Sequence, residues 1–205
     1  MGLMSILDAV MCVLWMATYT LVLIGTVKYQ YPLISLNTQA IIAPLEFSCL
    51  LMLIKTGQFG LDYVSLAYLY WSVIEIMIFL VTIKNGYIKR KYIAPYLCVV
   101  AVITCGLIYY VTIKEYLLFF NYVNTFAGVI FWLIFLIRDT KIPICPIMLA
   151  AFVAKFIADM LAVVVYLPRA HWGVGLICLF LPILDSVFIF VYLYRRKKMR
   201  NLSCT

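Results

Sequence analysis

Residues 41–54 read "IIAPLEFSCLLMLI", a stretch that is almost entirely apolar yet carries Glu46 near its middle. With its neighbours the run covers residues 36–54, close to the roughly 20 residues with which a helix crosses a hydrocarbon layer about 30 Å thick. A charged side chain at the centre of a bilayer costs about 2.5–3.5 kcal/mol even on the mildest scale. We therefore expect Glu46 to face a protein interior and to have a function.

The composition of the whole chain indicates a membrane protein. Of its 205 residues 67% are hydrophobic and 12% are charged, and the mean hydropathy is +1.12. Soluble domains contain roughly 45–50% apolar and about 25% charged residues. There is too little polar surface here to cover a soluble globule, so the class of soluble proteins is excluded.

Charged residues divide the chain into seven apolar runs, each long enough to span a bilayer as a helix. The first run lacks the basic N-terminal region of a cleaved signal peptide, so we expect it to be kept in the mature protein as the first helix. The loops are short, which predicts one all-α domain over residues 1–205: an integral membrane bundle of seven transmembrane helices. The predicted helices cover residues 6–27, 36–54, 63–83, 92–112, 115–137, 145–167 and 173–194.

The basic residues separate strongly between the two sides that seven spans would create. Twelve lie on the side of the C-terminus and only three on the side of the N-terminus. By the positive-inside rule the N-terminus is extracytosolic and the C-terminus cytosolic. The net charge of +8 thus reflects topology, and no nucleic-acid partner is expected. The three residues on the N-terminal side are Lys55, Lys114 and Arg169.

The remaining basic residue, Lys155, lies inside a predicted span together with Asp159. The two are four residues apart and so share one face of a helix, where each can neutralise the other. We expect a structural ion pair that joins helices.

Three further acids lie inside spans: Glu46, Glu75 and Asp185. None has a basic residue one turn away, and each is about 15 Å deep at 1.5 Å per residue. Burial without a partner disfavours the charged form, so we expect neutral carboxyl groups that are able to donate a proton. The alternative is that they hydrogen-bond to neighbouring helices and only hold them together.

Aromatic residues accompany these acids at helical spacing. Tyr68 and Trp71 lie on the stripe of Glu75, and Tyr192 lies two turns from Asp185. Such an interior fits a mostly apolar ligand with one polar group, whose cationic states the rings would stabilise. Alternatively, aromatic residues such as Trp15, Tyr31, Trp172 and Tyr194 belong to the membrane interface. Further candidate substrate contacts are Phe47, Asn124 and Trp132.

Several chemistries are disfavoured by the sequence. No two aspartates lie within four residues of each other, as a Mg²⁺–diphosphate site would require, and the seven cysteines have no metal-ligand spacing. The only histidine, His171, falls in a loop, which argues against a histidine-based metal site or a catalytic triad. We expect neither a metal nor a cofactor.

Two segments of the chain are similar to each other. "YWSVIEIMIFLVTIKNGYIKRK" (70–91) aligns with "FLPILDSVFIFVYLYRRKKMR" (180–200), with Glu75 opposite Asp185 and a basic cluster after each. This indicates a 3 + 1 + 3 plan in which the first and last three helices are parallel repeats, as in some small transporters. The Pro-Gln dipeptide of the sugar-exporter and PQ-loop families is absent.

Nearly the whole chain resembles the small seven-helix transmembrane terpene cyclases of fungal meroterpenoid and indole-diterpene pathways, the paxilline-type cyclases, and their bacterial relatives. The similar stretches are "LWMATYTLVLIGTVKYQYPLISL" (14–36), the run around Glu46, "LIRDTKIPICPIMLAAFVAKF" (136–156) and "LPILDSVFIFVYLYRR" (181–196). At the helix-2 acid the family usually reads Asn-x-x-Trp-Glu. This chain has Ile42 and Leu45 at the Asn and Trp positions.

The resemblance implies a function in terpenoid biosynthesis, within secondary metabolism. Family members protonate an epoxide or alkene of a polyprenyl substrate that enters from the bilayer, and the carbocation cyclises without a metal. Glu46 and Asp185 match the family's two essential acids, and Glu75, Trp71, Tyr68, Phe47 and Tyr192 would shape the pocket. The alternative is a small seven-helix transporter or ligand-binding membrane protein whose acids carry protons or hold a polar group.

Overall fold

The computed structural model describes residues 3–110, 114–168 and 172–203 as a set of α-helices, with no strand among them. Side chains are described at these positions except 3, 109–110, 114–121, 124, 172 and 200–203. The helices are α1 (Leu3–Tyr29), α2 (Leu36–Lys55), α3 (Tyr63–Lys84), α4 (Arg90–Tyr110), α5 (Lys114–Arg138), α6 (Pro146–Tyr166) and α7 (Trp172–Ser203).

The helices lie where the apolar runs predict them, with one difference at the C-terminus. The predicted last helix ends at residue 194, whereas α7 continues to Ser203. The added stretch, "RRKKMRNLS", contains mainly good helix formers, and its arginines and lysines lose little rotamer freedom in a helix. Hydropathy marks where the helix leaves the apolar layer, and the helix itself extends further.

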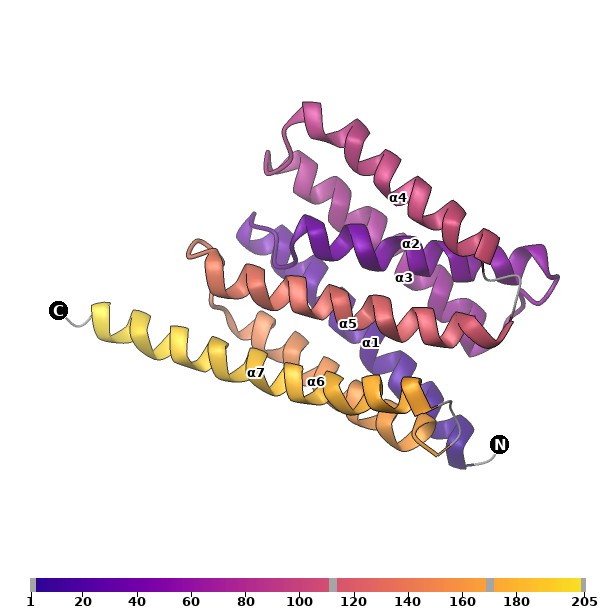
Figure 1. Ribbon diagram of the computed structural model, residues 1–205. Helices are drawn as coiled ribbons and strands as arrows, with labels where there is room; N and C mark the ends of the chain where they lie inside the picture. The colour runs from indigo at the N-terminus through magenta and orange to yellow at the C-terminus, as the bar shows by residue number, and fades with distance from the viewer. Residues whose placement is uncertain (1–2, 111–113, 169–171, 204–205) are drawn as a thin grey trace.

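The described helices have the length and composition of membrane spans. Six of them are long and apolar enough to cross a bilayer, and the described apolar part of the fifth helix, Thr125–Arg138, is shorter. These long apolar helices define a multi-pass membrane protein. Figure 1 shows the first turn of α1 and the last turn of α7 at opposite ends of the helix bundle.

The sequence also determines where helices begin and end. Asp62 precedes α3, and its Oδ1 accepts hydrogen bonds from the Val64 and Ser65 amides at 2.9 and 3.0 Å. Such an N-cap satisfies amides that have no partner within the helix. Gly86, just after α3, has φ of 77°, a conformation that glycine adopts without strain and that ends helices.

The helices pack side by side in a closed order. Helix α1 contacts α3, α3 contacts α2, α2 contacts α5, α5 contacts α7, α7 contacts α6, and α6 returns to α1. Helix α4 packs on α2 outside this ring, at the edge of the bundle in Figure 1. Helix α4 therefore presents most of its surface outward, and the interior is enclosed by the other six.

Close approach between α2 and α5 depends on a residue without a side chain. A Cβ atom added at Gly128 would lie 2.6 Å from Cγ1 of Ile42. The glycine therefore allows α5 to pack directly against the face of α2 that carries Ile42. This contact fixes one wall of the interior cavity described next.

Candidate functional site

An interior cavity of about 130 Å³ lies among α1, α2, α3, α5 and α6. Its wall is mainly aromatic and apolar, and three carboxyl groups, those of Asp8, Glu46 and Asp159, interrupt it. The other lining residues are Met11, Cys12, Trp15, Tyr19, Ile42, Leu45, Val64, Ala67, Tyr68, Trp71, Tyr122, Thr125 and Tyr166. A mostly apolar pocket with a few convergent polar groups is the usual form of a small-molecule site.

Glu46 is the cavity acid that α2 contributes. Its residue is only 4% exposed, and its Oε2 has no hydrogen-bond partner among the described residues. Because a buried polar atom without a partner is costly, it marks a place where a ligand, a water or a proton completes the structure. The cavity is the space from which such a partner would reach it.

Glu75, on α3, is a second buried acid that interacts with Glu46. It is 2% exposed, and within the described part of the chain neither of its carboxyl oxygens has a hydrogen-bond partner. Glu46 interacts with Glu75, and Tyr19 interacts with both carboxyl groups. Glu75 does not line the cavity. Two carboxyls on neighbouring helices thus interact electrostatically, and only that of Glu46 lines the cavity.

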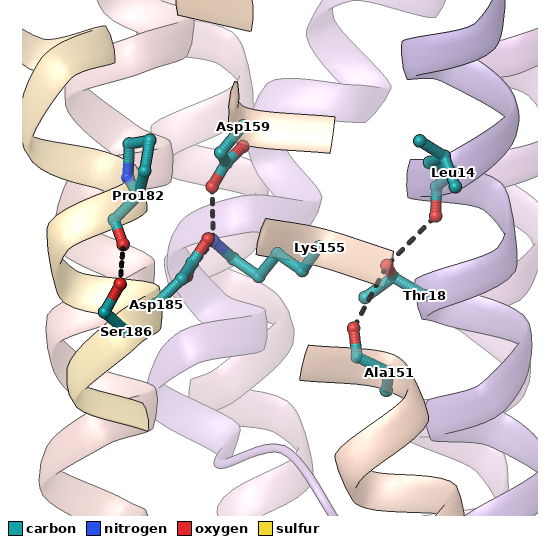
Figure 2. A network of polar contacts seen from close by, with 8 residues as sticks. All are labelled: Leu14, Thr18, Ala151, Lys155, Asp159, Pro182, Asp185 and Ser186. Carbon is teal, nitrogen blue, oxygen red and sulfur yellow. Dashed lines mark hydrogen bonds and ion pairs between the residues drawn. The ribbon is translucent and has the colours of Figure 1, made fainter. Parts of the chain in front are cut away.

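The predicted ion pair of Lys155 and Asp159 is present, with 2.6 Å between Nζ and Oδ2. The expectation that Asp185 lacks a basic partner is wrong, because Lys155 Nζ also lies 2.5 Å from Asp185 Oδ1, as Figure 2 shows. The partner comes from α6, 30 residues earlier in the chain, where spacing along α7 cannot reveal it. The Trp15 ring adds a third contact, 5.0 Å from Nζ to its centroid.

The two aspartates of this triad face different surroundings. Asp159 lines the cavity, and Asp185 does not. Asp185 is 1% exposed, and its second oxygen, Oδ2, has no hydrogen-bond partner among the residues described. In the C-terminal half of the chain the carboxyl available to a cavity ligand is thus that of Asp159, and Asp185 reaches it through Lys155.

The predicted aromatic contacts Tyr68 and Trp71 both lie in the cavity wall. Their rings meet edge to face, with centroids 5.3 Å apart and an interplanar angle of 87°. At the N-terminal end of α1, Asp8 accepts hydrogen bonds from Tyr63 at 2.8 Å and Tyr166 at 3.1 Å. These contacts join three helices where the cavity approaches the end of the bundle.

The other predicted substrate contacts lie elsewhere. Trp132 donates from Nε1 to the Leu33 carbonyl at 2.7 Å, and Tyr192 donates to the Cys145 carbonyl at 2.9 Å. Both belong to a buried ring cluster with Phe152 and Phe188, away from the cavity. Phe47 is half-buried and does not line the cavity. The side chain of Asn124, and His171, lie outside the described residues.

The cavity residues that the sequence reasoning missed include Asp8, Trp15 and Tyr19. Trp15 and Tyr19 are four residues apart on α1, with ring centroids 6.1 Å apart, and this spacing was the available signal. Trp15 instead fitted the alternative of a membrane-interface residue, whereas it lines the cavity and contacts Lys155. Asp8 lies near the helix end, where a charge carries less information.

Among the described residues, no group of three or more histidine, cysteine, aspartate or glutamate side chains is placed to hold a metal ion. Fold and site together define a multi-pass helical membrane protein with an acidic, aromatic interior cavity. Comparisons with protein-family models, with curated proteins and with solved structures find no match.

Proposed function

We propose that this protein is an integral membrane terpene cyclase that protonates an epoxide or alkene of a polyprenyl substrate and directs the cyclisation of the resulting carbocation. The observation that carries the proposal is Glu46: a buried carboxyl with an unpartnered oxygen, in the wall of a cavity lined by aromatic rings. A carboxyl in dry surroundings favours its neutral form and is a suitable general acid.

The reaction balances with acid residues alone. Glu46 would give its proton to the epoxide oxygen, which opens the ring at a carbon, or to an alkene carbon. The positive charge then moves through the double bonds as carbon–carbon bonds form, and loss of a proton from the hydrocarbon ends the reaction. One proton enters and one leaves, so the product is an isomer of the substrate. Asp159, which also faces the cavity, is suited to accept the second proton.

Asp185 has a positioning role in this proposal, because it touches Lys155 and not the cavity. The ion pair with Asp185 fixes the position of the Lys155 ammonium, which in turn binds the Asp159 carboxyl with 2.6 Å between Nζ and Oδ2. The Trp71 and Tyr68 rings would present their negative faces or edges to the developing cation and so influence which product forms.

Ile42 and Leu45, which replace the family's usual Asn and Trp, both line the cavity beside Glu46. Their apolar side chains suit a hydrocarbon chain end in place of a more polar or ring-bearing group. A cavity of about 130 Å³ would receive the reacting end of such a chain, with the rest in contact with lipid.

The proposal includes seven membrane spans, with the N-terminus outside and the C-terminus cytosolic, and a 3 + 1 + 3 internal repeat. The pattern of contacts between helices supports the repeat. Adding four to each helix number turns the contacts α1–α3 and α2–α3 into α5–α7 and α6–α7, and the contact α2–α5 corresponds to α6–α1. Helix α4 is left as the linker.

This pairing of helices also favours a second candidate function, a small transporter in which the two halves move against each other about the cavity. The two functions differ in outcome. A cyclase changes the covalent structure of its ligand, and a transporter only moves it.

The test is to incubate membranes containing the protein with a panel of prenylated epoxides and alkenes and to search for isomers of unchanged mass. We expect a cyclised product, its loss in Glu46→Gln, and its retention in Asp139→Asn, which removes a carboxyl outside the cavity. Trp71→Leu should change the ratio of products. Near-parental turnover per folded Glu46→Gln molecule would refute the proposal.

A further inference from the structure

The chain contains its own example of a bound ammonium group. Lys155 is 1% exposed, and its Nζ lies between carboxyl oxygens of Asp159 and Asp185 at 2.6 and 2.5 Å. The Trp15 ring is 5.0 Å away, within the range of a cation–π contact. Figure 2 shows the side chains of Asp159 on α6 and Asp185 on α7 beside that of Lys155. Two carboxyls from neighbouring helices and one indole thus surround a cation in this interior.

The N-terminal half has the carboxyls of such a site without the lysine. Helices α2 and α3 contact each other as α6 and α7 do, and Glu75 aligns with Asp185. On α6 and α7 the interacting residues are a lysine and an acid, Lys155 and Asp185, whereas on α2 and α3 they are two acids, Glu46 and Glu75, which interact electrostatically. Among the described residues of α2 and α3, the only basic ones are Lys55 and Lys84, in the last turns.

The cavity in front of Glu46 is suited to a cation. Three of its lining residues carry carboxyls, of which that of Asp159 is already paired with Lys155, and six carry aromatic rings; none of the described lining residues is itself basic. Glu46 Oε2, on a residue 4% exposed, has no hydrogen-bond partner in the described structure. The six rings are those of Trp15, Tyr19, Tyr68, Trp71, Tyr122 and Tyr166.

We propose that this cavity binds an amine on a small apolar body: the amine takes the proton of the neutral Glu46 and stays in the cavity as an ammonium group against the Glu46 carboxylate. The ammonium takes the place that a lysine side chain fills in the other half, and the apolar body lies against the rings. Asp8, at the end of the cavity, provides a first attraction for the positive charge. The proposal does not depend on cyclisation, because it concerns a ligand that binds without reacting beyond this proton transfer.

The first experiment compares two probes of similar size that differ in charge, 2-phenylethylammonium and 2-phenylethanol. Binding to the purified full chain in detergent is followed by calorimetry and by the fluorescence of Trp15 and Trp71, which line the cavity. We expect the ammonium to bind at least about tenfold more tightly, since a desolvated cation gains both ring and carboxylate contacts. Equal or weaker binding of the ammonium would overturn the proposal.

The second experiment removes the carboxylate. Glu46→Gln should abolish the preference for the ammonium while binding of 2-phenylethanol is kept. Asp139→Asn, which removes a carboxyl from a loop, should keep the preference. A preference that survives in folded Glu46→Gln would assign the cation to another group and refute the role of Glu46.

A measurement on the unaltered protein covers the case in which Glu46→Gln does not fold. A photoreactive azide of 2-phenylethylammonium should label peptides from α1, α2 and α3 that line the cavity, and excess unmodified probe should prevent it. Labelling of exposed peptides alone would contradict the proposal. If the protein binds the ammonium but forms no cyclised product, this inference stands and the cyclase proposal is weakened. If it forms a cyclised product but does not bind the ammonium, only this inference is contradicted.

Discussion

At the scale of single residues, the interior contains two pairs of acidic side chains, of which only one has a basic side chain to balance its negative charge. Asp159 and Asp185 share the ammonium of Lys155, whereas Glu46 and Glu75 have no basic neighbour among the described residues. A buried charge is tolerated when it is paired, and a buried carboxyl without a pair is stable when it is neutral. The first arrangement compensates the buried charges, and the second is the one to which the proposed function assigns a proton.

The role of Lys155 predicts the effect of its loss. Lys155→Met would leave two buried carboxyls facing each other without a cation, and we expect destabilisation of about 3–5 kcal/mol, the usual cost of removing one partner of a buried pair. Thermal unfolding in detergent measures it. The triple variant Lys155→Met, Asp159→Asn, Asp185→Asn has no charge left to compensate and should recover most of the stability. A Lys155→Met protein as stable as the parent would contradict a stabilising triad.

At the scale of helices, α2 carries the site and depends on α5 for its position. Gly128→Ala places a Cβ against Ile42 at 2.6 Å, so we expect a loss of about 1–3 kcal/mol from overpacking. Gly106→Ala on α4 is the matched control, since a Cβ there meets nothing within 4 Å. It should be neutral or slightly stabilising, because alanine favours helix. Ile42→Ala should restore the stability of Gly128→Ala. Equal unfolding temperatures of the two glycine variants would show that the close contact is absent.

Helix α3 begins at a cap that responds to pH and lies outside the membrane span. Hydrogen bonds from the Ser65 side chain and from the Ser65 amide lower the pKa of Asp62 below its ordinary value of 3.8. The cap is therefore fully effective above that ordinary value and is lost as pH falls through the lower pKa of the folded state. Hydrogen exchange at the Ser65 amide should lose protection over this acidic range. Asp62→Asn, whose amide oxygen caps without titrating, should show no such change, and an identical pH response in both proteins would exclude Asp62 as its source.

The helices were predictable from the sequence to a larger extent than the site. Apolar runs bounded by charges located α1 to α6 closely, because hydropathy and span length are local properties. The pairing of Lys155 with Asp185 was not predictable, since it joins helices whose contact no local spacing encodes. Trp15 and Tyr19 were missed although their spacing on α1 was a local signal, while Tyr68 and Trp71 were predicted from their helical spacing relative to Glu75 and do line the cavity.

At the scale of the whole molecule, six helices form a ring, five of them line an acidic cavity, and α4 lies outside the ring. The distribution of basic residues predicts that the C-terminus and the loop at residues 84–91 are cytosolic and that the loop at 55–62 is extracytosolic. Accessibility of inserted tags in intact and permeabilised cells measures this. A tag in the 84–91 loop that is exposed in intact cells would contradict the seven-span arrangement.

The central claim is that Glu46 presents a proton to the cavity, and infrared spectroscopy of the ligand-free protein tests it most directly. We predict a carboxylic acid carbonyl band that persists at neutral pH in the parent and in Asp139→Asn and that is lost or reduced in Glu46→Gln. A parent spectrum without such a band at neutral pH, or a band unchanged in Glu46→Gln, would contradict the account.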